Sequence, residues 1–184
     1  MELIGLYLVA CALLVAAGTA KAVRPTDTAR ALATFVPQPL ARIRAVVRFG
    51  SVAEATLGCI AILFPRAVPA GLVALSFAGF AVVIAVARQE GGAISSCGCF
   101  GTPDTPATVV HVVVNIGLAV AAAAVAVAGP TGSILSILAR QPGHGLPLIV
   151  ASAVCAWLTY LAISALAGLQ AVRRLTGVEF RSDR

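Results

Sequence analysis

The sequence TVVHVVVNIGLAVAAAAVAVA, residues 108–128, contains no Lys, Arg, Asp or Glu. An α-helix needs about 20 consecutive, mostly apolar residues to cross a bilayer, and this stretch is long enough. Four other segments have similar length and apolar character, at residues 3–23, 45–64, 69–87 and 147–168. We therefore expect an all-α integral membrane bundle of five transmembrane helices, forming a single transmembrane domain over residues 1–184.

The composition agrees with a protein that lies in a lipid bilayer. The chain is 60% apolar and only 11% charged, with a mean hydropathy of +1.01. Soluble domains are about half apolar and about a quarter charged. The net charge is +6, but the basic residues cluster beside the apolar segments, which is typical of membrane topology signals and not of nucleic-acid binding. The odd number of cysteines, five, argues against a secreted disulfide scaffold.

Lys and Arg are distributed unequally between the two ends of the predicted helices. Because cytoplasmic loops carry an excess of Lys and Arg, we expect a multi-pass plasma-membrane protein whose amino terminus lies outside. The segment between the third and fourth helices and the carboxyl terminus would then lie in the cytoplasm. The basic residues assigned to the cytoplasmic face are Lys21, Arg24, Arg30, Arg42, Arg44, Arg48, Arg88, Arg173, Arg174, Arg181 and Arg184, and those on the other face are Arg66 and Arg140.

Two connectors carry further expectations. The basic, proline-containing connector at residues 24–44 is expected to lie partly on the membrane surface. Its outward side chains would be Arg30, Arg42 and Arg44, and its inward side chains Leu32, Phe35 and Leu40. The short turn at residues 65–68 predicts an antiparallel hairpin of the second and third helices.

The polar segment before the fourth helix contains the sequence SCGCFG at residues 96–101. Paired thiols such as Cys97 and Cys99 can exchange electrons as a dithiol/disulfide couple, or they can hold a soft metal ion. A disulfide in so small a ring should be strained, which makes it easier to reduce and suits exchange. The motif therefore indicates a candidate thiol–disulfide oxidoreductase. A site for Cu or Zn, in which His111 would add a third ligand, stays open as the alternative.

Three polar residues inside the spans are expected near this motif. Glu54 lies roughly nine residues into the second helix, where a carboxylate is costly unless it is paired or protonated. His111 and Asn115 lie one turn apart at the start of the fourth helix and point the same way. Because both helices begin at the face that carries the cysteine segment, we expect Glu54, His111 and Asn115 to converge with Cys97 and Cys99 on one partly buried pocket.

These residues have candidate roles and simpler alternatives. Glu54 is expected to donate or accept a proton, or to anchor a cofactor headgroup, and His111 to act as a general base. Asn115 and Arg48 are the expected contacts to a cofactor, for which a quinone is one candidate. The simpler alternatives are a Glu54 neutralised by Arg48 or a neighbouring helix, a His111 bound to a loop carbonyl, and an Asn115 hydrogen bond between helices.

Other small residues inside the spans are expected to serve packing. Gly50 and Gly58 lie four positions on either side of the acidic residue of the second helix, so they would let another helix approach closely. Cys11, Cys59 and Cys155 are isolated within spans, and we expect them to fill the core as small apolar residues.

The spacing Arg-x5-Glu-x3-Gly at residues 48–58 and the SCGCFG motif together resemble the MauE methylamine-utilisation proteins, part of a wider DoxX-like group of redox-associated membrane proteins. The resemblance covers roughly the first four spans. It implies a membrane partner of thioredoxin-like proteins that serves disulfide formation or the maturation of exported proteins, with Cys97 and Cys99 as the redox pair and Glu54 as a polar core residue. A role in the maturation of exported proteins implies that the SCGCFG motif faces outward. The charge distribution instead places the motif in the cytoplasm, and we follow the charge distribution. An assembly subunit of a larger membrane complex stays open as a third interpretation.

Overall fold

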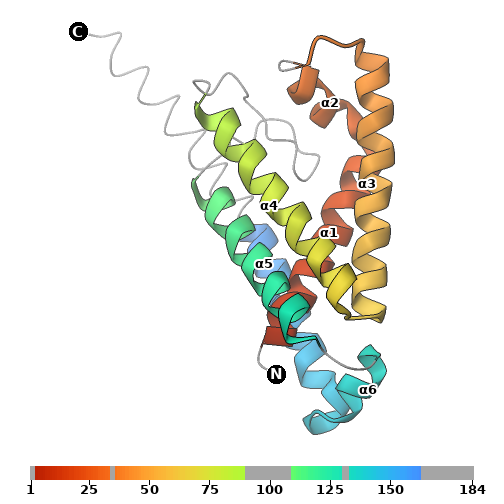
Figure 1. The fold of residues 1–184 in the computed structure, drawn as a ribbon, viewed down its shortest axis with the longest axis vertical. Coiled ribbons are helices and arrows are strands. Elements are labelled where there is room, and N and C mark those ends of the chain that lie inside the picture. Colours follow the sequence, from red (N-terminus) through yellow and green to blue (C-terminus); the bar gives the residue numbers. More distant parts are fainter. Residues whose placement is uncertain (1–2, 34–35, 90–108, 130–132, 163–184) are drawn as a thin grey trace, which may run out of the picture.

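A computed structural model describes residues 3–33, 36–89, 109–129 and 133–162. Within these ranges all regular secondary structure is helical, which confirms the all-α expectation (Figure 1). The helices are α1 (Leu3–Val23), α2 (Pro25–Ala33), α3 (Leu40–Leu63), α4 (Ala67–Gln89), α5 (Val109–Ala128), α6 (Ile134–Ala139), the 3-10 turn η1 (Pro142–Gly145) and a final helix over Leu146–Ala162.

Four of these helices, α1, α3, α4 and α5, are long and apolar enough to cross a membrane, and they confirm the first four predicted spans. Helix α3 begins at Leu40, earlier than the predicted residue 45, because Ile43 and Val47 extend its apolar stripe and pack against α2. The final helix is described only as far as Ala162. The rest of the predicted segment 147–168 lies outside the described residues, so a fifth crossing stays a prediction.

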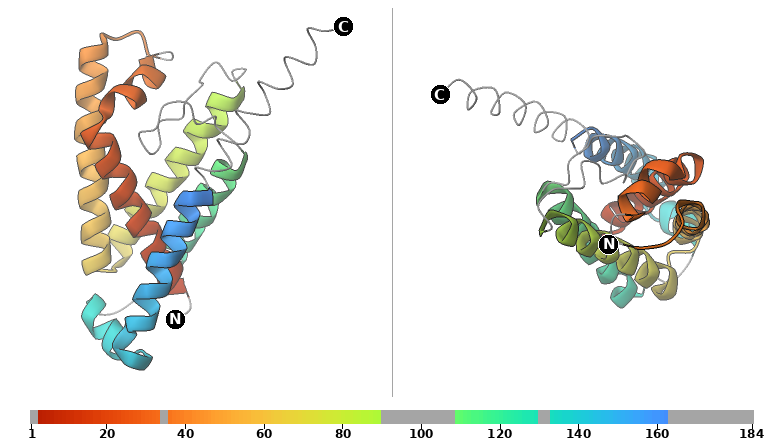
Figure 2. Two further views of the ribbon diagram at one scale, coloured as in Figure 1. Left: turned by 180° about the vertical axis from the view of Figure 1, so that it is seen from behind. Right: turned by 90° about the horizontal axis from the view of Figure 1, so that it is seen from above.

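The long helices form two tightly packed pairs. Helix α1 packs along α3, and α4 packs along α5, while α1 also contacts α5. The predicted short turn is present between α3 and α4, but these two helices diverge from it, and α1 fills the space between them (Figures 1 and 2). Helix α1 is accordingly the central one, with 56% of its residues buried against 22–28% in the other three spanning helices.

A hydrogen bond from α1 stabilises the turn between α3 and α4. Pro65 has no backbone N–H, so the carbonyl of Ala61, four residues earlier, lacks its usual helical donor. The hydroxyl of Tyr7 on α1 donates to this carbonyl over 3.0 Å. Tyr7 and Pro65 are both fully buried, and an unpaired carbonyl there would cost about 1–3 kcal/mol. The first helix therefore completes the hydrogen bonding of the turn.

Helix α2 gives the basic connector a folded structure. Ala29 and Leu32 of α2 pack against Ile43 and Val47 of α3 in an apolar cluster separate from the main core. The three arginines are exposed and Leu32 packs against the cluster, while the position of this connector on the membrane surface stays a prediction. Leu40 begins α3 and is 38% exposed, so it does not pack in this cluster, and its placement toward the membrane stays a prediction. Phe35 lies outside the described residues.

Candidate functional site

Glycines bring the backbones of α1 and α3 into direct contact. A Cβ atom on Gly18 of α1 would lie 2.7 Å from the backbone nitrogen of Ala55, and one on Gly58 of α3 would lie 2.6 Å from Val15 and 3.0 Å from the carbonyl oxygen of Cys11. Real Cβ atoms essentially never come closer than 3.0 Å to such neighbours. Small residues that allow close approach are the usual basis of helix association in membranes. This contact fixes the rotation of α3 relative to α1.

The two glycines predicted to flank Glu54 have different environments. Gly58 lies in the contact with α1, as expected. Gly50 is exposed, and a Cβ there would have no neighbouring atom within 4 Å, so its expected packing role is wrong. The two lie eight residues apart, which rotates one about 80° from the other around the helix. Only the side of α3 that carries Gly58 faces α1.

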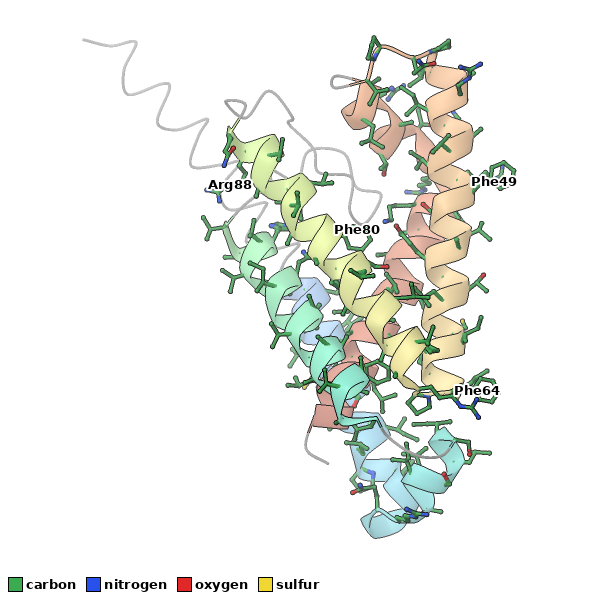
Figure 3. All side chains as sticks on the ribbon, viewed as in Figure 1. Phe49, Phe64, Phe80 and Arg88 are labelled. Carbon is green, nitrogen blue, oxygen red and sulfur yellow. The ribbon has the colours of Figure 1, made fainter. Side chains whose placement is uncertain are left out.

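The close contact aligns Lys21 of α1 with Glu54 of α3. The ammonium nitrogen of Lys21 lies 2.5 Å from a carboxylate oxygen of Glu54, and the two side chains are only 9% and 23% exposed. The ammonium group also lies 4.4 Å from the ring centroid of Phe80, which points from α4 toward the first helix pair (Figure 3). An aromatic face attracts a cation. Lys21, Glu54 and Phe80, the charged cluster, thus connect α1, α3 and α4.

Lys21 is the residue that the sequence interpretation missed. In the sequence it serves only as a basic residue that indicates topology. A carboxylate inside a membrane needs a counter-charge, and this need points to a basic partner for Glu54. Arg48, the basic residue that the sequence offers as a possible partner of Glu54, is exposed. The alternative in which a neighbouring helix neutralises Glu54 is therefore the arrangement in the structure.

His111 and Asn115 lie on α5 and form a second polar group. His111 is only 2% exposed, and Asn115 is half-buried. The side-chain amide of Asn115 donates to the carbonyl oxygen of His111 over 2.7 Å, so this hydrogen bond stays within one helix and does not join two helices. The i, i+4 relationship places both residues on one side of α5. Helix α1 lies between α5 and α3, the helix that carries Glu54 (Figure 2).

Cys97 and Cys99 lie outside the described residues. The helices on either side of their segment are described: α4 finishes at Gln89 and α5 starts at Val109, at the end of the bundle where α1 finishes and α3 begins (Figure 1). Lys21 and His111 both lie within one turn of a helix terminus at this end. The convergence of all the expected site residues on one pocket stays a prediction.

The cysteines inside the helices differ in their surroundings. Cys11 is fully buried in the main core, as expected. Cys59 and Cys155 are exposed on their helices, so the core-filling role predicted for them is wrong. Lipid tails are as apolar as a protein core, which lets a small apolar side chain face outward at little cost. Within the described ranges, no three His, Cys, Asp or Glu residues gather as a metal ion would require.

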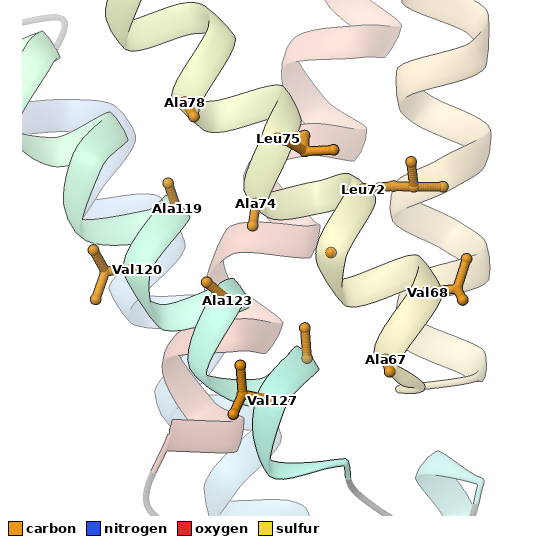
Figure 4. A pocket seen from close by; sticks show the side chains of 12 residues that line it. Ala67, Val68, Leu72, Ala74, Leu75, Ala78, Ala119, Val120, Ala123 and Val127 are labelled. Carbon is orange, nitrogen blue, oxygen red and sulfur yellow. The ribbon is translucent and has the colours of Figure 1, made fainter.

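An apolar groove runs along the outer side of α4 and α5 (Figure 4). Its twelve lining residues are all Ala, Gly, Val or Leu, so their side chains offer no hydrogen-bonding group to a ligand. This chemistry suits the acyl chains of the surrounding bilayer. The groove therefore lacks the polar groups that reactive chemistry needs.

The structure is that of a multi-pass membrane protein. It has four long apolar helices, a charged pair shielded between two of them, and a surface covered by Val, Leu, Ile and Phe. The sequence model of the family "Methylamine utilisation protein MauE" matches residues 2–128, which cover α1 to α5. The chain therefore belongs to the MauE family. Neither a search of curated proteins nor a search of solved structures finds a match.

Proposed function

We propose that this protein is a membrane thiol–disulfide redox protein that exchanges electrons through Cys97 and Cys99 with a thioredoxin-like or exported protein. The observation that carries the proposal is the position of the SCGCFG motif in the chain. It belongs to the segment between α4 and α5, whose described ends lie at the same end of the bundle as the last turn of α1, which carries Lys21. Membership of the MauE family supports a membrane protein with a redox-related function.

The proposed exchange proceeds through a mixed disulfide. A thiolate of the pair attacks one sulfur of the partner's disulfide, so the partner's S–S bond breaks, a mixed disulfide forms and one partner thiol leaves. The second thiol of the pair then attacks the mixed disulfide and releases the partner as a dithiol. Cys97 and Cys99 finish as a disulfide, and two electrons and two protons have passed to the partner. The reverse sequence reduces the pair again.

Polar groups at the same end of the bundle would support this exchange. A nearby cation favours the thiolate form of a cysteine, and Lys21 is a buried cation among the described residues at this end. His111, in the first turn of α5, is the proposed general base for a cysteine thiol. Glu54 is proposed as a proton donor or acceptor, acting through its contact with Lys21.

Trapping of thiols in cells tests the proposal. Cells that express the Cys59→Ser/Cys155→Ser variant are quenched with acid and alkylated with a mass-increasing maleimide, with and without prior treatment with dithiothreitol. This variant lacks the two exposed cysteines of the described helices, so the redox-dependent change should come from Cys97 and Cys99. We expect a population with two thiols protected from alkylation until reductant is added.

The matched control is Cys97→Ser/Cys99→Ser, which keeps Cys59 and Cys155 and should show no redox-dependent change. Full alkylation of Cys97 and Cys99 in growing aerobic cells without reductant would contradict the proposal.

Binding of Cu(I) or Zn by Cys97, Cys99 and His111 is the second candidate function. It is favoured by the burial of His111 in the first turn of α5, next to the cysteine segment in the chain. Elemental analysis of protein purified without chelator separates the two functions. Near-stoichiometric metal that disappears in Cys97→Ser/Cys99→Ser would support metal binding in place of exchange.

A further inference from the structure

We propose that α2 and the first turns of α3 bind the headgroups of anionic phospholipids. The surface is formed by five arginines, here called the basic belt, and it does not depend on the thiol chemistry proposed above. The members of the basic belt are Arg24, Arg30, Arg42, Arg44 and Arg48.

The charge of this region is concentrated and unbalanced. Residues 24–48 contain five Arg and a single acidic residue, Asp27, so their net charge is +4. All five arginines are exposed, and Asp27 lies 3.6 Å from the guanidinium of Arg30 alone. Clusters of four to eight basic residues beside a membrane helix are typical of binding to anionic lipids. The opposite end of the described bundle carries only Arg66 and Arg140.

Packing holds part of the basic belt in a fixed arrangement. The apolar side of α2 is fixed to α3 through Ile43 and Val47, which are 6% and 8% exposed. Arg44 and Arg48 each follow one of these buried residues and are four positions apart, so they form a row on one side of α3. Two neighbouring arginines can both donate hydrogen bonds to the oxygen atoms of one phosphate group.

Neighbouring apolar side chains favour a lipid over free phosphate. Val46 and Phe49 are 66% and 77% exposed and alternate with Arg44 and Arg48 along the same turns of α3. Large exposed apolar residues belong in the hydrocarbon, whereas arginines reach toward the headgroups. The boundary between the two environments therefore crosses these turns. A phospholipid offers both a phosphate for the arginines and acyl chains for Phe49.

The test compares lipids retained by the full-length protein. Protein is reconstituted in nanodiscs of phosphatidylglycerol and phosphatidylcholine in a one-to-three mixture, then released and examined by native mass spectrometry at low salt. We expect wild-type protein to retain phosphatidylglycerol in preference to phosphatidylcholine. Arg44→Gln/Arg48→Gln should reduce this preference about tenfold, because each basic residue near the surface contributes to the attraction.

The matched control, Arg66→Gln/Arg140→Gln, removes the same charge from the opposite end and should leave the preference within about twofold, since screening limits the range of surface charges. An equal loss in both variants, retention in proportion to the mixture, or displacement of the lipid by millimolar inorganic phosphate would overturn the proposal. If Arg44→Gln/Arg48→Gln does not fold, Arg24→Gln/Arg30→Gln at and beside α2 takes its place. The same reduction in preference is expected, and the same outcomes would overturn the proposal.

Discussion

At the scale of single residues, the protein depends on the pairing of Lys21 with Glu54. A single buried charge is costly in a membrane, whereas two opposite charges at 2.5 Å offset most of each other's cost. Phe80 adds a favourable aromatic face for Lys21 but none for Glu54. The two members of the pair are therefore unequal. Lys21 keeps a second stabilising contact when Glu54 is changed, whereas Glu54 loses its basic partner when Lys21 is changed.

A double-mutant cycle measures this pairing. Lys21→Met leaves the carboxylate without its partner and should reduce the free energy of unfolding by about 3–5 kcal/mol. Glu54→Gln should cost less, because Phe80 still contacts the ammonium group. The double variant should cost clearly less than the sum of the two. The changes in the free energy of unfolding of all three variants are measured by unfolding in sodium dodecyl sulfate, followed by circular dichroism in mixed micelles. Strictly additive changes would show that the pair contributes no coupling energy.

At the scale of helices, the contact between α1 and α3 determines where the charged cluster lies. The helices run in opposite directions and come into close contact at Gly18 and Gly58, where each glycine lies against the backbone of the other helix. The hydrogen bond from Tyr7 to Ala61 lies farther along the same contact. Because the backbones touch at Gly18 and Gly58, neither helix can rotate without losing both the close contact and the alignment of Lys21 with Glu54.

Glycine substitutions test this close contact. Gly18→Ala would place a methyl group against the backbone of α3 and should destabilise the protein by about 1–3 kcal/mol. Gly50→Ala is the control at a position of α3 where space is open, and it should be neutral or stabilising by up to about 1 kcal/mol, since alanine is the better helix former. Thermal unfolding of both variants in one detergent compares them. Equal effects would contradict the proposed role of the α1–α3 contact.

At the scale of the whole molecule, the two helix pairs place several polar features at one end. The basic belt, the last turn of α1 with Lys21, and the helix ends on either side of the cysteine segment lie there (Figure 1). By the charge distribution we propose that this end faces the cytoplasm of a plasma-membrane protein. A redox pair on that side would meet cytoplasmic partners.

Labelling with an impermeant thiol reagent tests the orientation. In intact cells that express Cys59→Ser/Cys155→Ser, Cys97 and Cys99 should react only after permeabilisation. The control adds Arg140→Cys, an exposed position at the opposite end, to a Cys97→Ser/Cys99→Ser background, and it should react in intact cells. Reaction of Cys97 and Cys99 in intact cells, with protection of residue 140, would reverse the proposed orientation.

Local properties of the sequence determined the helical class, the four long spans and the family. A spanning helix needs only about 20 apolar residues and satisfies its own backbone hydrogen bonds, so its existence can be predicted without knowing its neighbours. The start of α3 was misplaced, because the packing of Ile43 and Val47 on α2 extends that helix beyond the apolar segment.

Only the tertiary structure decided which groups meet. The partner of Glu54 lies 33 residues away on another helix, and the donor to the Ala61 carbonyl lies 54 residues away. Gly50 and Gly58 look equivalent in the sequence, yet only Gly58 faces α1. The predicted burial of Cys59 and Cys155 is wrong for the same reason, because the sequence does not show which side of a helix faces its neighbours. Lipid and protein interior are similarly apolar, so composition cannot tell which side of a membrane helix faces its neighbours, and the packing of α1 against α3 decides it.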